Sequence, residues 1–138
     1  TGAFGVIAIV LLLFFKIHAI EAIDSERWRA LLAVPVLSRW AMVLLAYRSK
    51  AAKEGLGSTL IHQLSTKHFF ISTFVTLLLV AAVLRGTGVF MMAWVAIFSL
   101  ASKNYFQRRL GGVTGDTFGA VGELSETSVF VFLALGAK

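Results

Sequence analysis

The stretch RRLGGVTGDTFGAVGELSE, Arg108–Glu126, is the part of this sequence on which the fold and the candidate site depend. It places five glycines and three acidic residues inside a chain that is otherwise strongly apolar. Glycine weakens a helix interior by about 1 kcal/mol relative to alanine. An acidic side chain beside lipid costs about 2.5–3.5 kcal/mol on insertion scales. A stretch that carries both costs is a candidate functional site.

The spacing of the acidic residues predicts one polar helix face. If a helix starts near Thr114, each residue turns by about 100°. Asp116, Glu123 and Glu126 then lie in one narrow sector, together with Gly119. Carboxylates on one face are typical of a site where a metal ion bridges phosphate oxygens.

The glycines of the stretch allow two interpretations. Three glycines just before the helix allow a tight loop: Gly111, Gly112 and Gly115. Such a loop can expose backbone N–H groups to an anion. Alternatively, Gly115 and Gly119 form a small-residue face for helix packing, and the acids pair with lysine or arginine.

The composition indicates an integral membrane protein. The chain has 138 residues, of which 58% are hydrophobic, and its mean hydropathy is +0.85. The absence of cysteine excludes disulfides, thiolate metal sites and a cysteine nucleophile. The net charge is +6, but the basic residues lie mostly between apolar segments, which indicates membrane topology and no nucleic-acid partner. Because the sequence begins with threonine, we expect a fragment of a larger protein.

The predicted fold class is all-α, a polytopic transmembrane helix bundle with about five helices in a single membrane domain that covers residues 1–138. Twenty helical residues span roughly 30 Å, enough to cross a bilayer. The expected spans are, in chain order, Phe4–Ile23, Glu26–Arg48, His68–Leu84, Val89–Phe106 and Thr114–Gly136.

The second span carries two local expectations. Asp24 or Ser25 is expected to cap its start, and Pro35 is expected to kink it.

Two basic residues fall inside apolar spans and need an explanation. Lys16 is expected to extend its ammonium group toward the nearer membrane interface. Arg39 lies in the middle of the second span and requires a carboxylate, a carbonyl or a phosphate. An internal salt bridge with Glu123 or Glu126 and a phosphate contact both remain open.

The longest polar connection is Tyr47–Lys67. Gly55 and Gly57 are expected to break any helix after Glu54. The connection is either a solvated loop or a basic loop that meets an anionic substrate. Its charged residues are Arg48, Lys50, Lys53, Lys67 and the single acid Glu54.

Alternating spans place this connection and the Lys103–Asp116 connection on one side of the membrane, together with Thr1 and Gly2 at the entry to the first span. This side holds most of the basic residues, so the positive-inside rule places it in the cytoplasm. The sequence therefore predicts a cytoplasm-facing site for an anionic substrate.

The segment R-L-G-G-V-T-G-D-T-F-G-A-V-G-E-L-S-E, Arg109–Glu126, resembles the C-terminal signature of cobalamin synthases, the adenosylcobinamide-GDP ribazoletransferases. The segments S-R-W-A at Ser38–Ala41 and Y-R-S-K-A-A-K-E-G-L-G at Tyr47–Gly57 are similar to the same family. The opening T-G-A-F-G looks like the end of the family's S-R-x-G-T-x-G segment. The resemblance covers essentially the whole chain but only about the C-terminal half of the family's protein.

The resemblance implies a magnesium-dependent transferase of the bacterial or archaeal inner membrane, with its active face in the cytoplasm. Such an enzyme joins adenosylcobinamide-GDP to α-ribazole or its 5′-phosphate and releases GMP. Its expected partners are these two substrates and membrane lipid, and a homo-oligomer is left open. The family's aspartate-rich D-G-x-x-D-x-x-D-G segment is absent from this sequence. We therefore expect the chain alone to carry only part of the metal site and to be inactive.

By this resemblance, Asp116, Glu123 and Arg39 are the expected catalytic residues, and Asp116, Glu123 and Glu126 are the expected Mg²⁺ ligands. The expected substrate-binding residues are Arg48, Lys53, Glu54, Gly111, Gly112, Thr114 and Gly115.

Two rival functions stay open. A transporter or channel fragment would use the acids and the membrane arginine as an ion relay. Another membrane phosphotransferase that acts on nucleotide-linked alcohols is the second rival, although the aspartate-rich signature of that family is not present.

Overall fold

The computed structural model describes residues 2–136 and is built from helices. Between these residues the chain forms no extended strand, only one isolated β-bridge. This confirms the predicted all-α class. The helices are α1 (Ala3–Glu21), α2 (Arg27–Ala46), α3 (Leu56–Gln63), α4 (Thr66–Leu84), α5 (Gly86–Leu110) and α6 (Gly115–Gly136).

Five of the helices, all except α3, are long and apolar enough to cross a membrane. They contain between 19 and 25 residues, and 20 residues rise about 30 Å. The chain is therefore an integral membrane protein, as its composition predicts. Much of its apolar surface is exposed, α1 above all, as expected for side chains that face lipid rather than water.

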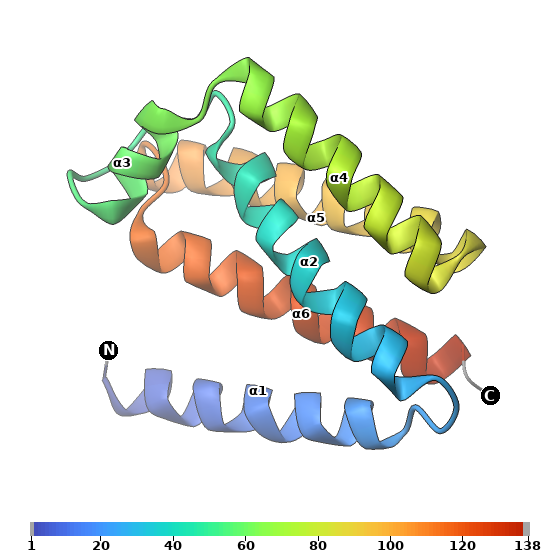
Figure 1. Ribbon diagram of the computed structural model, residues 1–138. Coiled ribbons are helices and arrows are strands. Elements are labelled where there is room, and N and C mark those ends of the chain that lie inside the picture. Colours follow the sequence, from blue (N-terminus) through green and yellow to red (C-terminus); the bar gives the residue numbers. More distant parts are fainter. Residues whose placement is uncertain (1, 137–138) are drawn as a thin grey trace.

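Helix α2 lies at the centre of the bundle and packs against α4, α5 and α6 (Figure 1). Its side chains Val34, Leu37 and Leu45 are fully buried, and they meet Val95 of α5 and Val121 of α6 in one apolar core. Helix α1 lies at the side of the bundle and packs mainly against α6, and it contributes Ala19 to the core.

Side-chain hydrogen bonds tie the helices together inside the bundle. Such interhelical bonds contribute about 0.5–2 kcal/mol each in membrane proteins. They are the Ser38 hydroxyl donating to the Gly122 carbonyl at 2.9 Å, the Trp40 indole donating to the Thr73 hydroxyl at 3.0 Å, and the Trp94 indole donating to the Ser128 hydroxyl at 3.1 Å.

The start of α2 differs from the prediction. Neither Asp24 nor Ser25 caps it; the capping position is Glu26, and no side chain there bonds to a backbone N–H group. Glu26 adopts a left-handed backbone with φ of 59°, and its carboxylate instead forms an ion pair of 2.6 Å with Arg29. Helix α2 runs through Pro35 to Ala46.

The basic connection is also more ordered than predicted. Gly55 and Gly57 do not end a helix: α3 begins directly after Gly55, and Gly57 is buried within it. The reason is a close tertiary contact. A Cβ atom on Gly57 would lie 3.0 Å from the Gly115 nitrogen at the start of α6, so the missing side chain lets the two helices approach.

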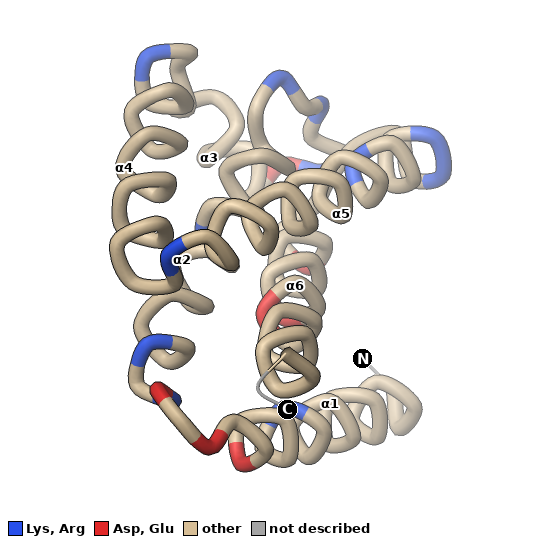
Figure 2. Tube along the Cα trace, turned by 90° about the vertical axis from the view of Figure 1, so that its right-hand side faces the viewer, with Lys and Arg blue, Asp and Glu red and all other residues tan. Residues whose placement is uncertain are grey.

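The links of the bundle gather at two ends. The loop end holds the start of α1, the α2–α4 link with α3, and the α5–α6 link (Figure 1). The turn end holds the α1–α2 link, the α4–α5 turn and the end of α6. Most charged residues lie in these links and at helix ends rather than along the helices (Figure 2). The prediction that both glycine-bearing links lie on one side is confirmed, because the α2–α4 and α5–α6 links share the loop end. Thr1 lies outside the described residues.

Because the chain has no cysteine, single cysteines can report its topology. We expect Lys50→Cys and Arg109→Cys to react with a membrane-impermeant maleimide from the same side of sealed vesicles. Ser25→Cys, at the turn end, is expected to react from the opposite side. Labelling of Lys50→Cys and Arg109→Cys from opposite sides would contradict the arrangement of the helices.

Candidate active site

Two loops pair through their backbones at the loop end. We call residues 47–55 the basic loop and residues 111–114 the glycine loop. The Val113 N–H group donates to the Lys50 carbonyl at 2.8 Å, and the Ala52 N–H group donates to the Val113 carbonyl at 3.0 Å. These bonds form a parallel bridge between Ala51 and Val113. The side chain of Val113 is fully buried beneath it, so the pairing is part of the core and not a surface contact.

The pairing depends on glycine at two positions of the glycine loop. A Cβ atom on Gly112 would overlap the Lys50 carbonyl and would lie 2.6 Å from the Ala52 nitrogen. Gly111 ends α5 with φ of 73°, a left-handed conformation that a residue with a side chain adopts only at a cost. The predicted role of these glycines as the residues of a tight loop agrees with this geometry.

The basic loop is held from its other side as well. The Lys103 ammonium group of α5 donates to the Tyr47 carbonyl. The Tyr47 ring stacks on the Phe69 ring with 4.0 Å between centroids, and the Arg48 guanidinium lies 5.3 Å from the same tyrosine ring. Arg48 has φ of 53°, so the chain turns sharply where this cation is presented. The loop is therefore positioned, and not a freely solvated link.

The start of α6 is fixed by a pair of threonines. The Thr114 N–H group donates to the Thr117 hydroxyl at 2.8 Å, and that hydroxyl donates to the Thr114 carbonyl at 2.8 Å. Asp116 lies in the first turn of α6 and is exposed. A carboxylate at this end of a helix is stabilised by the helix dipole. Asp116 thus lies directly beside the glycine loop.

A polar hollow of about 810 Å³ lies against the basic loop. Lys53 and Glu54 line it and are exposed, so an anionic ligand can reach the lysine. The remaining lining residues are Ala51, Ala52, Gly55, Leu56, Ser58, Thr59 and His62.

The two glutamates of α6 pair with a lysine, which confirms that part of the alternative interpretation, although the sequence did not identify Lys16 as the partner. The Lys16 ammonium group of α1 lies 2.6 Å from Glu123 Oε2 and 3.2 Å from Glu126 Oε1. Lys16 therefore forms an ion pair between α1 and α6. The prediction that its ammonium group extends to the membrane interface is wrong. One signal in the sequence could have predicted this ion pair: a lysine and two glutamates lie at similar depth in different spans.

The three acids do not form one compact cluster. Asp116 lies seven residues before Glu123, which corresponds to about 10 Å along the helix. Within residues 2–136, no three His, Cys, Asp or Glu side chains are close enough together to hold a metal ion. Glu123 and Glu126 nevertheless hold one cation jointly, the Lys16 ammonium, and so form a set of two oxygen donors.

Arg39 forms no ion pair with either glutamate, so the predicted salt bridge with Glu123 or Glu126 is wrong. Its guanidinium contacts the Met42 sulfur at 3.7 Å and lines a groove of about 330 Å³ between α2 and α4. The neighbouring residue, Ser38, is the one that faces α6. One step along a helix turns the side chain by about 100°, and sequence alone does not show which of the two positions faces α6.

The alternative of a packing face at Gly115 and Gly119 is also not what the structure shows. A Cβ atom on either glycine would meet no described atom within 4 Å. The close approaches occur instead at Gly57, Gly88 and Gly112, and Gly122 makes an ordinary contact with Met42.

Comparison with known proteins relates this architecture to one family. The family model described as cobalamin-5-phosphate synthase matches residues 1–134. The adenosylcobinamide-GDP ribazoletransferase of Geotalea daltonii is 34% identical over 139 residues, which cover 99% of this chain and 56% of that protein. The proteins of the same name from Syntrophobacter fumaroxidans and Desulforamulus reducens are 38% and 35% identical, over 91% and 99% of this chain. No solved structure matches the chain.

The chain spans about half the length of the curated relatives it matches, between 52% and 56% of the three named above.

Replacing Gly112 with alanine tests the pairing of the two loops. The added Cβ atom would collide with backbone atoms of residues 50–52, and overpacking of this kind costs about 1–3 kcal/mol. We expect a lower unfolding temperature in detergent and faster proteolysis within the basic loop. Gly119→Ala, whose Cβ atom meets nothing within 4 Å, should leave both measurements unchanged or raise stability slightly. Equal effects of the two variants would contradict the close approach.

Replacing Lys16 with methionine tests the contact between α1 and α6. The change leaves two carboxylates without their cation, and we expect a loss of about 0.5–2 kcal/mol in unfolding free energy. Adding Glu123→Gln and Glu126→Gln to the same chain should recover most of that loss, because no unpaired charge then remains. Lys67 is exposed and lies outside the group of Lys16 and the two glutamates, so Lys67→Met serves as the control. If the triple variant is no more stable than Lys16→Met, the ion pair is not the stabilising contact.

Proposed function

Since the chain belongs to the cobalamin-5-phosphate synthase family, we propose that it is part of an adenosylcobinamide-GDP ribazoletransferase. The names of the relatives support this assignment for the protein as a whole. The feature of this chain that carries it furthest is the backbone pairing of the basic loop with the glycine loop, because it brings cations, exposed backbone and a carboxylate to one end of the bundle.

The proposed reaction is the transfer of adenosylcobinamide phosphate from GMP to ribazole. A hydroxyl oxygen of α-ribazole or its 5′-phosphate forms a bond to the cobinamide phosphorus. The anhydride bond to the GMP phosphate breaks, GMP leaves with the electron pair, and the hydroxyl proton is released. Reactions of this class are accelerated mainly by positioning the phosphates and by neutralising their charge.

The basic loop supplies groups of the required kind. Arg48 and Lys53 would bind phosphate oxygens, and Glu54 would keep the lysine oriented in the polar hollow. Gly111 and Gly115, which are exposed, would let the phosphates approach the backbone at the start of α6. Gly112 would contribute by holding the two loops together, and Thr114 by fixing the first turn of α6 through its bonds with Thr117. Lys103 acts indirectly, because it donates a hydrogen bond to the Tyr47 carbonyl and so holds the basic loop in place. Arg39 would reach a phosphate only if the ligand extends to the α2–α4 groove.

Magnesium is proposed as the cofactor. The two oxygen donors Glu123 and Glu126, with Asp116 nearer the loops, are the acids of this chain that would hold it. A protein typically offers Mg²⁺ one or two carboxylates and leaves the other positions to water and substrate phosphates. The ion would neutralise charge on the phosphates. Because no compact group of three such ligands lies within residues 2–136, further ligands would come from substrate or from chain outside this sequence.

The loop end is proposed to face the cytoplasm of a bacterial or archaeal cell, in the inner membrane. It holds Arg48, Lys50, Lys53, Lys67, Lys103, Arg108 and Arg109, whereas the turn end balances three arginines against three acids. The positive-inside rule favours this orientation. The transporter alternative gains no support, because within residues 2–136 no hydrogen bond or ion pair joins Arg39 to the α6 glutamates as a relay would require.

Asp116→Asn tests the site in the full-length enzyme. With adenosylcobinamide-GDP and α-ribazole phosphate as substrates, we expect turnover to fall at least 100-fold across a magnesium titration, because a carboxylate beside the phosphates is lost. Asp24→Asn makes the same chemical change at the turn end and should leave turnover unaltered. Normal turnover of Asp116→Asn would reduce the acid face of α6 to a structural role. No turnover by the unmodified protein would contradict the proposed reaction itself.

A further inference from the structure

A second pocket lies at the turn end, on the far side of the bundle from the two loops. Its volume is about 490 Å³, within the range of small-ligand sites. Four parts of the chain build it: the α1–α2 link, the first turn of α2, the α4–α5 turn and the end of α6. None of the residues proposed for transferase activity lies in it.

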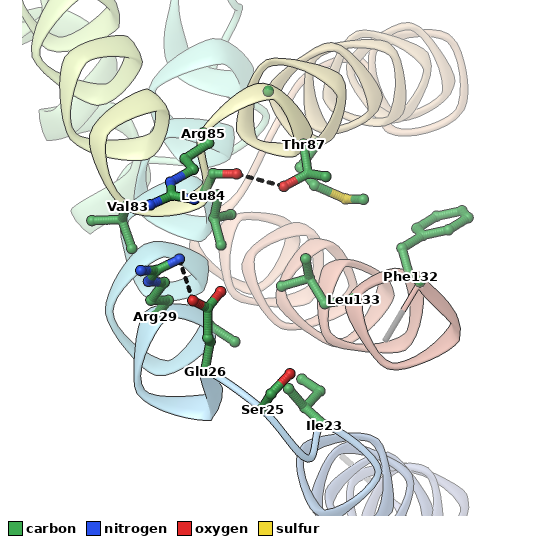
Figure 3. Close-up of a pocket in the computed structure, with 14 residues that line it drawn as sticks. Ile23, Ser25, Glu26, Arg29, Val83, Leu84, Arg85, Thr87, Phe132 and Leu133 are labelled. Carbon is green, nitrogen blue, oxygen red and sulfur yellow. Dashed lines mark hydrogen bonds and ion pairs between the residues drawn. The ribbon is translucent and has the colours of Figure 1, made fainter. Parts of the chain in front are cut away.

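The pocket has a cationic wall and an apolar wall. Figure 3 shows the guanidinium groups of Arg29 and Arg85 on one side and the side chains of Phe132 and Leu133 on the other. Glu26 is the one acid of the lining and is already paired with Arg29 at 2.6 Å. The lining therefore carries one net positive charge. Among residues 2–136, no ion pair engages Arg85.

The backbone holds these charged residues in unusual conformations. Glu26 and Arg85 have φ of 59° and 56°, and they are two of the three non-glycine residues with positive φ in the described chain. Such conformations cost energy and are typical of functional sites. Glycine is the residue that adopts a positive φ most readily, and a glycine, Gly86, directly follows Arg85 in the chain. An arginine is held there instead, at the rim of the pocket.

The pocket also lies at the depth where lipid head groups begin. It is formed at the ends of helices of membrane-spanning length, and Trp28, a half-exposed residue of the interfacial type, precedes Arg29. The Arg29 guanidinium lies 5.4 Å from the Trp28 ring. Arginine guanidinium groups bind phosphate through charge-assisted hydrogen bonds, so the cationic wall suits a phosphate head group and the apolar wall suits an acyl chain.

We propose that this pocket binds one anionic phospholipid, with its phosphate at Arg85 and Arg29 and an acyl chain along Leu84, Phe132 and Leu133. The site is separate from the transferase site and does not depend on the proposed function. In the orientation given above, the lipid belongs to the outer leaflet. Glu26 orients Arg29 through their ion pair, and Arg85 supplies the charge that no acid among residues 2–136 balances through an ion pair.

Native mass spectrometry of the delipidated full-length protein in detergent tests the proposal. The probes are dioleoylphosphatidylglycerol, dioleoylphosphatidylcholine and inorganic phosphate. We expect one phosphatidylglycerol to bind more tightly than phosphatidylcholine. Arg85→Gly should weaken that binding about tenfold or more, which is the range of a lost charge-assisted hydrogen bond. Because glycine relaxes a positive φ, this variant should unfold at the same or a higher temperature, so misfolding does not explain the loss.

The controls separate lipid binding from general charge attraction. Arg108→Gln removes one positive charge at the loop end and should leave lipid binding unchanged. Displacement of the lipid by millimolar inorganic phosphate would show that the pocket is an anion site and not a lipid site. Equal binding of the two lipids, unchanged binding in Arg85→Gly, or equal loss in Arg108→Gln would each overturn the proposal.

Discussion

Backbone pairing between residues 50–52 and Val113 is the interaction on which the loop end depends. It joins two links that are about sixty residues apart in the sequence, and it buries Val113 completely. Two backbone segments can approach so closely only where one of them has no side chain at the contact, which is the role of Gly112. The start of α6 and the position of Asp116 follow from this contact. The same contact, together with the Lys103 bond to the Tyr47 carbonyl and the stacking of Tyr47 on Phe69, places the cationic groups of the basic loop.

The distribution of polar groups separates two kinds of chemistry. At the loop end, cations lie in exposed links beside a helix start, where water and a phosphorylated ligand can reach them. Deeper in the bundle, the charged groups of α1 and α6 face one another. A carboxylate inside a membrane protein is costly unless it has a partner, so the glutamates of α6 are satisfied by a lysine even before any metal is considered. A divalent cation at the same glutamates would have to displace or share this ammonium group.

Much of the architecture could be predicted from the sequence. Hydropathy located the five membrane-length helices, and α6 begins and ends where the glycine–acid stretch indicated. Charge asymmetry placed the basic loop and the glycine loop on one side, and the structure brings them into contact. These features depend on composition over many residues, so local irregularities do not disturb them.

The details that failed are those that depend on which way a side chain turns in the packed bundle. Arg39 lines the groove between α2 and α4, whereas the neighbouring Ser38 makes the hydrogen bond to Gly122 of α6. Helix α3 forms in a segment with two glycines because tertiary contact with α6 outweighs local propensity. The Lys16 ion pair has consequences for biosynthesis as well. Lys16 enters the membrane 107 residues before Glu123 is made, and at about 5–20 residues per second this interval lasts roughly 5–20 s. Throughout it, α1 carries a charge with no partner in α6, so α1 can dock in its final place only after α6 has been synthesised.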